Sequence, residues 1–256
     1  MRILTTGVLS GFGKAVHERF GGEGLAFTRP ERERELDRAR RFAPEVIIHC
    51  AANPARDMSA GDLLTVLEDN VLLTRDLTKI PHRKFIFLSS IDVYAVPPGP
   101  HREDTPLDPR LPRNLYATTK MLAEAAVRLQ CSDHVIVRSS AMLGRHARRN
   151  ALMRMLEENP CRLTLSGESS FYYVLYEDLL DFLAAAMDRG LRGTYNAAAA
   201  APVTLAAAAE RLGKTVSFGD YRYGCGTIDN SRIVAECPAF RKTSLDAVEE
   251  FLKQRV

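Results

Sequence analysis

A tyrosine and a lysine four residues apart, Tyr116 and Lys120, are the first residues whose types suggest chemistry. Apolar residues recur at helical spacing through residues 114–129, which predicts an amphipathic helix with both side chains on one face. A neighbouring ammonium favours the phenolate and lowers the pKa of a tyrosine, so this phenol could exchange a proton near neutral pH. Taken alone, the pair is better explained by a surface lysine beside a half-buried tyrosine.

Three glycines follow the first expected strand, residues 2–6, and precede a helix that runs to residue 20. Gly7, Gly11 and Gly13 predict a tight turn from strand to helix. Without side chains, such a turn lets the backbone approach a pyrophosphate at the amino end of the helix. Its position after the first strand favours dinucleotide binding over an ordinary glycine-containing loop.

The choice of dinucleotide depends on the end of the second expected strand, residues 25–28. An acidic residue there would bind a ribose hydroxyl, but Arg29 follows this strand. A guanidinium suits a 2′-phosphate, so we expect NADP, with NAD as the alternative. Arg29 could equally be a solvated loop charge.

Strands and helices alternate through the first half of the chain. The apolar runs at residues 46–52 and 85–89 are typical of parallel strands covered on both faces. We therefore expect an α/β fold with a doubly wound parallel sheet. The other expected elements lie at residues 31–41, 63–77, 135–138, 145–156, 162–166, 175–187, 193–197, 203–212 and 244–253. The predicted dinucleotide-binding domain covers residues 1–144 and 172–197, and a small substrate-binding part covers residues 145–171 and 198–256.

Composition and charge argue against several other classes of function. With 256 residues, 46% of them hydrophobic, the chain can bury a substantial core. A net charge of +3 is too small to indicate nucleic acid or an anionic membrane as the main partner. No apolar run has the length of a membrane span. Five scattered cysteines without a CxxC pair predict reduced thiols in a cytoplasmic protein that has no metal site.

Short motifs follow one another along the chain in a characteristic order. They are TGxxxGxG at 6–13, HxAA at 49–52, Asn70, SSxxVY at 89–94, EDxPxxP at 103–109, YxxxK at 116–120, Glu124, RSS at 138–140 and GTYN at 193–196. Their order and spacing resemble the extended short-chain dehydrogenase/reductase superfamily, the NAD-dependent epimerase/dehydratase family. The resemblance runs to about residue 215 and implies a Rossmann fold. The short chain, with its small substrate-binding part, is similar to nucleotide-sugar 4-ketoreductases.

This resemblance implies a role for each matching residue. Ser90 would hydrogen-bond the substrate oxygen while Tyr116 donates or accepts the proton. Lys120 would hold the nicotinamide ribose, and Asn70 would support that lysine. The implied cofactor contacts are Gly7, Ser10, Gly11, Phe12, Gly13, Ala51, Ala52, Ser139 and Ser140. The implied substrate contacts are Asn53, Ile91, Asp92, Arg145 and Arg149.

The residues after Ser90 depart from one branch of the family. Its dehydratases carry two adjacent acids there, where this chain has Ile91 and Asp92. With one acid left, dehydration is disfavoured. Asp92 is either a catalytic base or a turn residue, and we favour the turn residue.

A second departure concerns recognition of a diphosphate. Phe171 stands where many members carry an arginine that binds the nucleotide diphosphate. Arg145, Arg148 and Arg149 could replace it, because guanidinium pairs well with phosphate oxygens. They could instead form the solvated start of the helix expected at 145–156, or the substrate could lack a diphosphate.

The resulting interpretation is an NAD(P)-dependent oxidoreductase that reduces a keto group of a sugar, which we expect to be nucleotide-linked. One alternative is an epimerase that oxidises and re-reduces the same carbon on tightly held NAD. Another is a non-catalytic dinucleotide-binding sensor on the same fold. By family analogy we expect a homodimer, and the sequence identifies neither the sugar nor the nucleotide.

Overall fold

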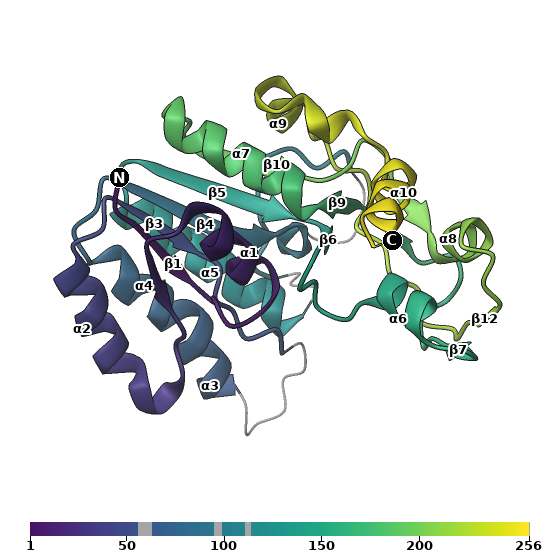
Figure 1. Cartoon of the computed structure of the whole chain (residues 1–256), viewed down its shortest axis with the longest axis horizontal. Coiled ribbons are helices and arrows are strands. Elements are labelled where there is room, and N and C mark those ends of the chain that lie inside the picture. Colours follow the sequence, from purple (N-terminus) through teal and green to yellow (C-terminus); the bar gives the residue numbers. More distant parts are fainter. Residues whose placement is uncertain (56–62, 95–98, 111–113, 256) are drawn as a thin grey trace.

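The computed structural model describes residues 1–55, 63–94, 99–110 and 114–255, without the side chain of Arg29. A six-stranded parallel sheet runs through the molecule with helices on both faces (Figure 1). Across the sheet, the strands are β10 (Gly193–Ala197), β5 (His134–Ser139), β4 (Lys84–Ser90), β3 (Val46–His49), β1 (Ile3–Thr6) and β2 (Glu23–Leu25). The predicted doubly wound α/β fold is confirmed.

Burial on both faces explains why these apolar runs form strands. Along β3, Val46 and Ile48 pack in one core cluster, whereas Ile47 packs in another. Helices of the first cluster are α1 (Gly11–Phe20) and α7 (Tyr176–Asp188). Helices of the second cluster are α2 (Arg32–Phe42), α4 (Leu73–Thr78) and α5 (Leu115–Gln130). Alternate side chains of one strand therefore pack against the helices on opposite faces of the sheet.

Strand order creates a crevice at one edge of the sheet. Because β1 lies between β2 and β3, the chain winds away from β1 in both directions. Loops after β1 and β3 consequently separate at the carboxyl ends of these strands, where doubly wound folds bind their ligands.

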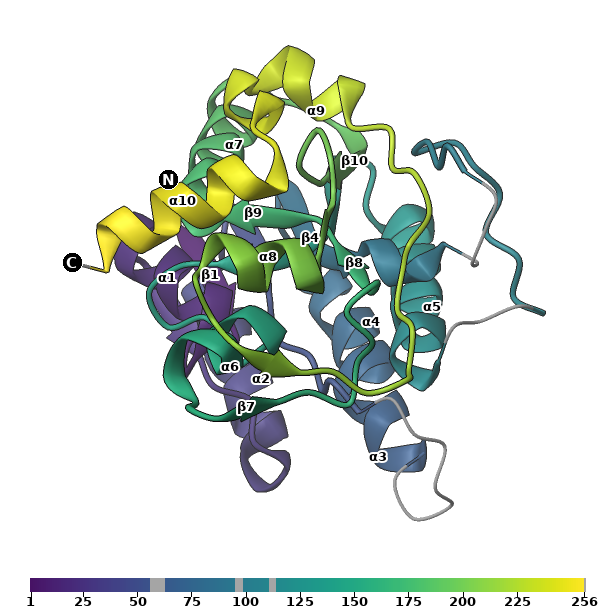
Figure 2. The same cartoon turned by 90° about the vertical axis from the view of Figure 1, so that its right-hand side faces the viewer.

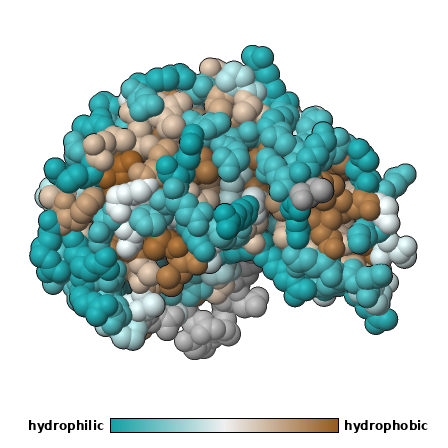
Figure 3. Space-filling model, viewed as in Figure 1, coloured by the Kyte–Doolittle hydropathy of each residue, from teal (hydrophilic) through white to brown (hydrophobic). Residues whose placement is uncertain are grey.

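The small part consists of short helices and paired strands beside the sheet (Figure 2). Its helices are α6 (Ala151–Glu157), α8 (Leu205–Arg211) and α10 (Ser244–Gln254). Its strand pairs are β6 (Ala141–Leu143) with β9 (Tyr173–Leu175), β7 (Cys161–Arg162) with β12 (Val216–Ser217), and β8 (Ser170–Phe171) with β11 (Val203–Thr204). In the space-filling view, an apolar area lies over this part, whereas polar side chains cover much of the remaining face (Figure 3).

One segment of the expected substrate-binding part packs on the sheet side instead. Helix α9 (Ser231–Glu236) contacts β10 and α7. Its Ile233, together with Phe240 of the following 3-10 turn, belongs to the core cluster of the first helical layer. The domain division stays a prediction, and residues 231–241 show that its two parts interlock.

Several expected elements differ from the structure. The strand expected at 46–52 ends with β3 at His49, and the strand expected at 162–166 is only the short β7. The helix expected at 63–77 is interrupted by a π-helical turn at Glu68–Leu72.

Strand β2 ends at Leu25 rather than at Thr28, because its partner β1 ends at Thr6, which pairs with Leu25. The helix expected from residue 145 begins at Ala151, because the Asn150 side chain caps it by accepting a hydrogen bond from the Met153 amide at 3.0 Å. The three arginines before Asn150 therefore lie on a loop, not on a solvated helix face. Among the described helices, none is long and apolar enough to cross a membrane.

Candidate active site

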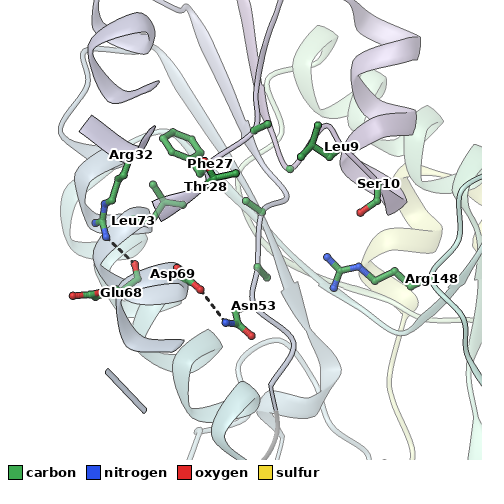
Figure 4. A pocket seen from close by; sticks show the side chains of 14 residues that line it. Leu9, Ser10, Phe27, Thr28, Arg32, Asn53, Glu68, Asp69, Leu73 and Arg148 are labelled. Carbon is green, nitrogen blue, oxygen red and sulfur yellow. Dashed lines mark hydrogen bonds between the residues drawn. The ribbon is translucent and has the colours of Figure 1, made fainter. Parts of the chain in front are cut away.

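Two adjoining cavities open at the carboxyl ends of the central strands. The first has a volume of about 550 Å³ and is shown in Figure 4. The second has a volume of about 290 Å³ and reaches from the glycine turn to the start of α5. Gly7, Ser10, Ala52 and Arg148 line both. The two cavities therefore form one continuous cleft.

The glycine turn is packed so closely that side chains are excluded from it. A Cβ on Gly7, whose φ is +79°, would lie 2.8 Å from the Ala51 amide nitrogen. A Cβ on Gly13 would lie 2.5 Å from the Gly7 carbonyl oxygen. Ser10, the N-cap of α1, makes no side-chain capping bond with the described residues. The first amides of α1 thus face the cleft, as an anion site requires.

The far end of the first cavity carries a cation that sequence reasoning missed. Arg32 lines the cavity beside Phe27 and Thr28. Its guanidinium donates to the Asp76 carboxylate at 2.8 Å. It also donates to the Glu68 carbonyl at 3.3 Å (Figure 4). These bonds hold the positive charge in place at the cavity wall. The one sequence signal for Arg32 as a cofactor contact is its position three residues after the predicted Arg29.

Ser90 ends β4 at the second cavity and begins a short 3-10 turn, Ile91–Val93. Its hydroxyl oxygen accepts a hydrogen bond from the Asp92 amide at 3.1 Å. Because the oxygen is the acceptor in this bond, the hydroxyl hydrogen can be donated to a substrate oxygen. Local turn geometry therefore orients Ser90 as a donor.

Tyr116 and Lys120 line the same cavity from the first turns of α5. The Asn114 side chain caps this helix by accepting from the Ala117 amide at 2.9 Å, which fixes where α5 begins. The Lys120 ammonium lies 5.6 Å from the centre of the Tyr116 ring and donates to the Leu88 carbonyl at 2.7 Å. Burial lowers the pKa of Lys120 to about 8. The structure thus brings the predicted serine, tyrosine and lysine to one cavity.

Asn70 lies behind the cleft, in a π-helical turn (Glu68–Leu72) that links α3 (Leu63–Leu67) to α4. Its side chain accepts from the Asn53 amide at 2.7 Å and donates to the Asn53 carbonyl at 2.9 Å. It also donates to the Thr119 hydroxyl at 2.9 Å. Asn70 therefore ties the loop after β3, at Asn53, to Thr119, the residue that precedes Lys120 in α5.

His49, the last residue of β3, is completely buried between two threonines. The Thr74 hydroxyl donates to the Asn70 carbonyl at 2.6 Å, so it must accept from His49 Nε2 at 2.9 Å. His49 Nδ1 then accepts from Thr6 Oγ1 at 2.7 Å. Burial, with a smaller contribution from the nearby Lys120 charge, lowers the pKa of His49 to about 3. The ring is therefore neutral, with its proton on Nε2.

The wall opposite Ser90 comes from the C-terminal third of the chain. The Tyr223 hydroxyl donates to the Asp92 carboxylate at 2.8 Å and accepts from the Cys225 thiol at 3.3 Å. The Tyr223 ring stacks on Phe171, with centroids 4.6 Å apart. Phe171 therefore contributes to an aromatic wall of the second cavity. Sequence reasoning missed Tyr223 and Cys225, since nothing in their local pattern places them beside residue 92.

Most of the other predicted contacts line the cleft. Lining the second cavity are Gly7, Ser10, Gly11, Phe12, Gly13, Ala52, Ser90, Ile91, Asp92, Tyr116, Lys120, Ser139, Ser140 and Arg149. Ala51 and Asn53 line the first. The side chain of Arg29 lies outside the described part of the structure. Arg145 lines a separate cavity of about 350 Å³ with His146 and Arg255. In the described ranges, no cluster of His, Cys, Asp or Glu could hold a metal.

A protein-family model matches more than half of the chain. Residues 23–198 match the NAD dependent epimerase/dehydratase family, so the chain belongs to that family. Methionine adenosyltransferase 2 subunit beta from Xenopus laevis is 32% identical over 163 residues. That match covers 56% of this chain and spans 47% of the length of the relative.

Solved structures share the whole fold at low sequence identity. dTDP-4-dehydrorhamnose reductase from Bacillus anthracis, in complex with NADP, is 16% identical with a TM-score of 0.82 and covers 99% of both chains. UDP-glucuronic acid 4-epimerase from Bacillus cereus, in complex with UDP-glucuronic acid and NAD, is 19% identical with a TM-score of 0.75 over 100% of both chains. At these identities the likeness concerns the fold.

Proposed function

We propose that this chain is an NADP-dependent oxidoreductase that reduces a keto group of a nucleotide-linked sugar. The observation that carries this proposal is that Ser90, Tyr116 and Lys120 line one cavity, which continues into the cleft over the glycine turn. A polar donor, a phenol and an ammonium at the end of a dinucleotide cleft are the groups that carbonyl reduction needs.

The cleft is suited to NADP in two respects. The glycine turn is packed too closely against backbone to carry side chains, so its backbone can approach a diphosphate. The fixed guanidinium of Arg32 supplies a counter-charge for a 2′-phosphate. Arg29 remains a second predicted contact to that phosphate. When bound, NADPH would supply the hydride. Titration should show tighter binding of NADPH than of NADH, and Arg32→Ala should remove that preference.

Each residue of the trio has a distinct part in this proposal. Ser90 donates its hydroxyl hydrogen to the keto oxygen and so orients the carbonyl. Tyr116 delivers a proton to the same oxygen as negative charge develops there. The Lys120 ammonium, which donates to the Leu88 carbonyl, stabilises the phenolate that Tyr116 becomes. Placing these groups on a rigid strand end and a capped helix keeps them aligned for reaction.

The test is turnover of NADPH with keto sugars that carry a nucleoside diphosphate. We expect stoichiometric loss of NADPH absorbance with formation of the hydroxy sugar. Tyr116→Phe should abolish turnover and leave NADPH binding intact, whereas the exposed Tyr221→Phe should behave like the wild type. Full activity of Tyr116→Phe would refute the mechanism. Interconversion of sugar isomers without net cofactor use would instead establish an epimerase.

A second candidate function is a non-catalytic dinucleotide-binding subunit. The specific observation in its favour is the match to a protein named as the beta subunit of a methionine adenosyltransferase. In that case the cleft would bind NADP or NAD, and no sugar would be turned over. Tyr116→Phe would then change neither cofactor binding nor any partner-dependent activity.

A further inference from the structure

Arg148 occupies an unusual position between the two parts of the chain. It belongs to the loop between β6 and α6, yet it lines both the first and the second cavity. A Cβ on Gly11 would lie 3.6 Å from Arg148 Nε, so the side chain lies directly against the glycine turn. In Figure 4 its guanidinium points into the first cavity from the side opposite Arg32.

The charge of this guanidinium is not balanced by a nearby acid. Among the described residues, Arg148 makes no ion pair within 4 Å, whereas the adjacent Arg149 pairs with Glu158 at 2.6 Å. Lys120 and the amino end of α1 add further positive potential to the same cleft. Burial is the main cause of the lowered pKa of Lys120, and the charge of Arg148 lowers it further. Such a concentration of positive charge favours an anionic ligand.

We propose that Arg148 binds the diphosphate of the dinucleotide from the side opposite the glycine turn. The inference rests on the proposed function and adds a cofactor contact supplied by the small part of the chain. The diphosphate would lie between the first amides of α1 and the guanidinium, which can donate to oxygens of both phosphates. Cofactor binding would then fix the loop 144–150, which is continuous with the substrate side of the cleft through Arg149 and Asn150.

Calorimetric titration of full-length variants tests this contact. The variants are Arg148→Ala, Arg148→Lys and, as a matched control, Arg145→Ala, which changes an arginine of the same loop at a different cavity. The ligands are NADPH and adenosine 2′-monophosphate, which lacks the diphosphate. We expect Arg148→Ala to raise the Kd of NADPH roughly 10- to 100-fold, as loss of a charge-assisted hydrogen bond does. Arg148→Lys should lose less, and Arg145→Ala nothing.

The second ligand shows which part of the cofactor is contacted. Binding of adenosine 2′-monophosphate should be equal in the wild type and Arg148→Ala. An equal loss for both ligands, or an unchanged Kd for NADPH, would overturn the inference. It would also be overturned if Arg148→Ala weakened only the binding of a nucleotide sugar, since the arginine would then contact the substrate diphosphate. A wild-type protein that bound neither NADPH nor NADH would refute the proposed function itself, and this contact with it.

Discussion

At the residue scale, Lys120 combines a structural cost with a chemical use. Its ammonium is buried with one carbonyl partner, which is an expensive place for a charge. The penalty is visible in a pKa lowered by burial from 10.5 to about 8. A lysine buried for stability alone is expected to pair with a carboxylate, as the fully buried Lys84 does with Asp133. The position of Lys120 beside Tyr116 instead supports a role in the proton transfer proposed above.

The lowered pKa of Lys120 predicts a pH dependence of stability. Between about pH 8 and 10.5 the unfolded chain still binds the proton that the folded chain has released, so the free energy of unfolding rises with pH. Relative to Lys120→Met, the wild type should gain about 3 kcal/mol over this range. Urea denaturation at several pH values measures the difference, with the exposed Lys214→Met as control. If the free energy of unfolding depended on pH in the same way for the wild type and Lys120→Met, the lowered pKa of Lys120 would be refuted.

His49 predicts the corresponding effect in acid. Its pKa is about 3 in the folded protein, against 6.5 ordinarily, so the unfolded state binds more protons between these values. Stability is therefore lost as the pH falls below 6.5. Between pH 6.5 and 4.5 the wild type should lose about 2 kcal/mol relative to His49→Gln. Thermal unfolding of both proteins at these pH values is the measurement. His82→Gln, at a half-buried surface histidine, should not reproduce the effect.

At the element scale, the glycine turn, the π-helical turn and the start of α5 act as one frame around the cleft. His49 is hydrogen-bonded to Thr6 at the end of β1 and to Thr74 on α4. Asn70 is hydrogen-bonded to Thr119 on α5. The sequence predicted the glycine turn and the helix that carries Lys120, because they depend on local patterns, but it did not predict the π-helical turn inside the helix expected at 63–77. It could not predict the partners of Asn70 or His49, because those contacts join residues far apart in the chain.

A methyl group in the glycine turn should weaken dinucleotide binding. Gly13 lies within α1, where alanine is intrinsically favoured over glycine. Any loss in Gly13→Ala therefore comes from the 2.5 Å approach of the new Cβ to the Gly7 carbonyl, which would open the turn. We expect at least a tenfold rise in the Kd of NADPH. Gly21→Ala, whose Cβ would meet no atom within 4 Å, should keep normal binding despite its positive φ.

Differences between expectation and structure at this scale have physical causes. Strand β2 is shorter than its apolar run because its neighbour turns away at Gly7. The basic segment 145–149 is a loop because Asn150 is a better cap than interior residue. Arg32 was missed because its role depends on the ion pair with Asp76, which lies on a different helix. Secondary-structure propensity is a property of each segment alone, whereas the end of β2 and the role of Arg32 depend on residues elsewhere in the fold.

At the scale of the whole molecule, the cleft joins parts that are distant in sequence. Ser90 and Lys120 come from the sheet side, whereas Tyr223 and Cys225 come from the C-terminal third of the chain. The aromatic contact between Phe171 and Tyr223 closes the second cavity on the substrate side. A substrate bound in this cavity, as proposed, would contact both parts at once, which is why the first half alone could not define its identity.

Cofactor should protect the loop that carries Arg148 from proteolysis. Trypsin cleaves after arginine, and both Arg148 and Arg149 are exposed on this loop. If the dinucleotide diphosphate fixes the loop, NADPH should slow cleavage there several-fold while leaving cleavage after the exposed Lys214 unchanged. Mass spectrometry of the fragments provides the rates. Equal protection at both sites would indicate general stabilisation, and protection that survived in Arg148→Ala would exclude this contact as its cause.

The packing of α9 on the sheet has a consequence for biosynthesis. Ile233 and Phe240 complete the apolar layer between α7 and β10, although more than thirty residues of chain separate them from β10. As the nascent polypeptide emerges from the ribosome, that layer stays open to water until residue 240 has left the exit tunnel. The first half of the chain is made before the segment that covers this layer, so the interval before residue 240 emerges is when a chaperone would have an apolar surface to bind.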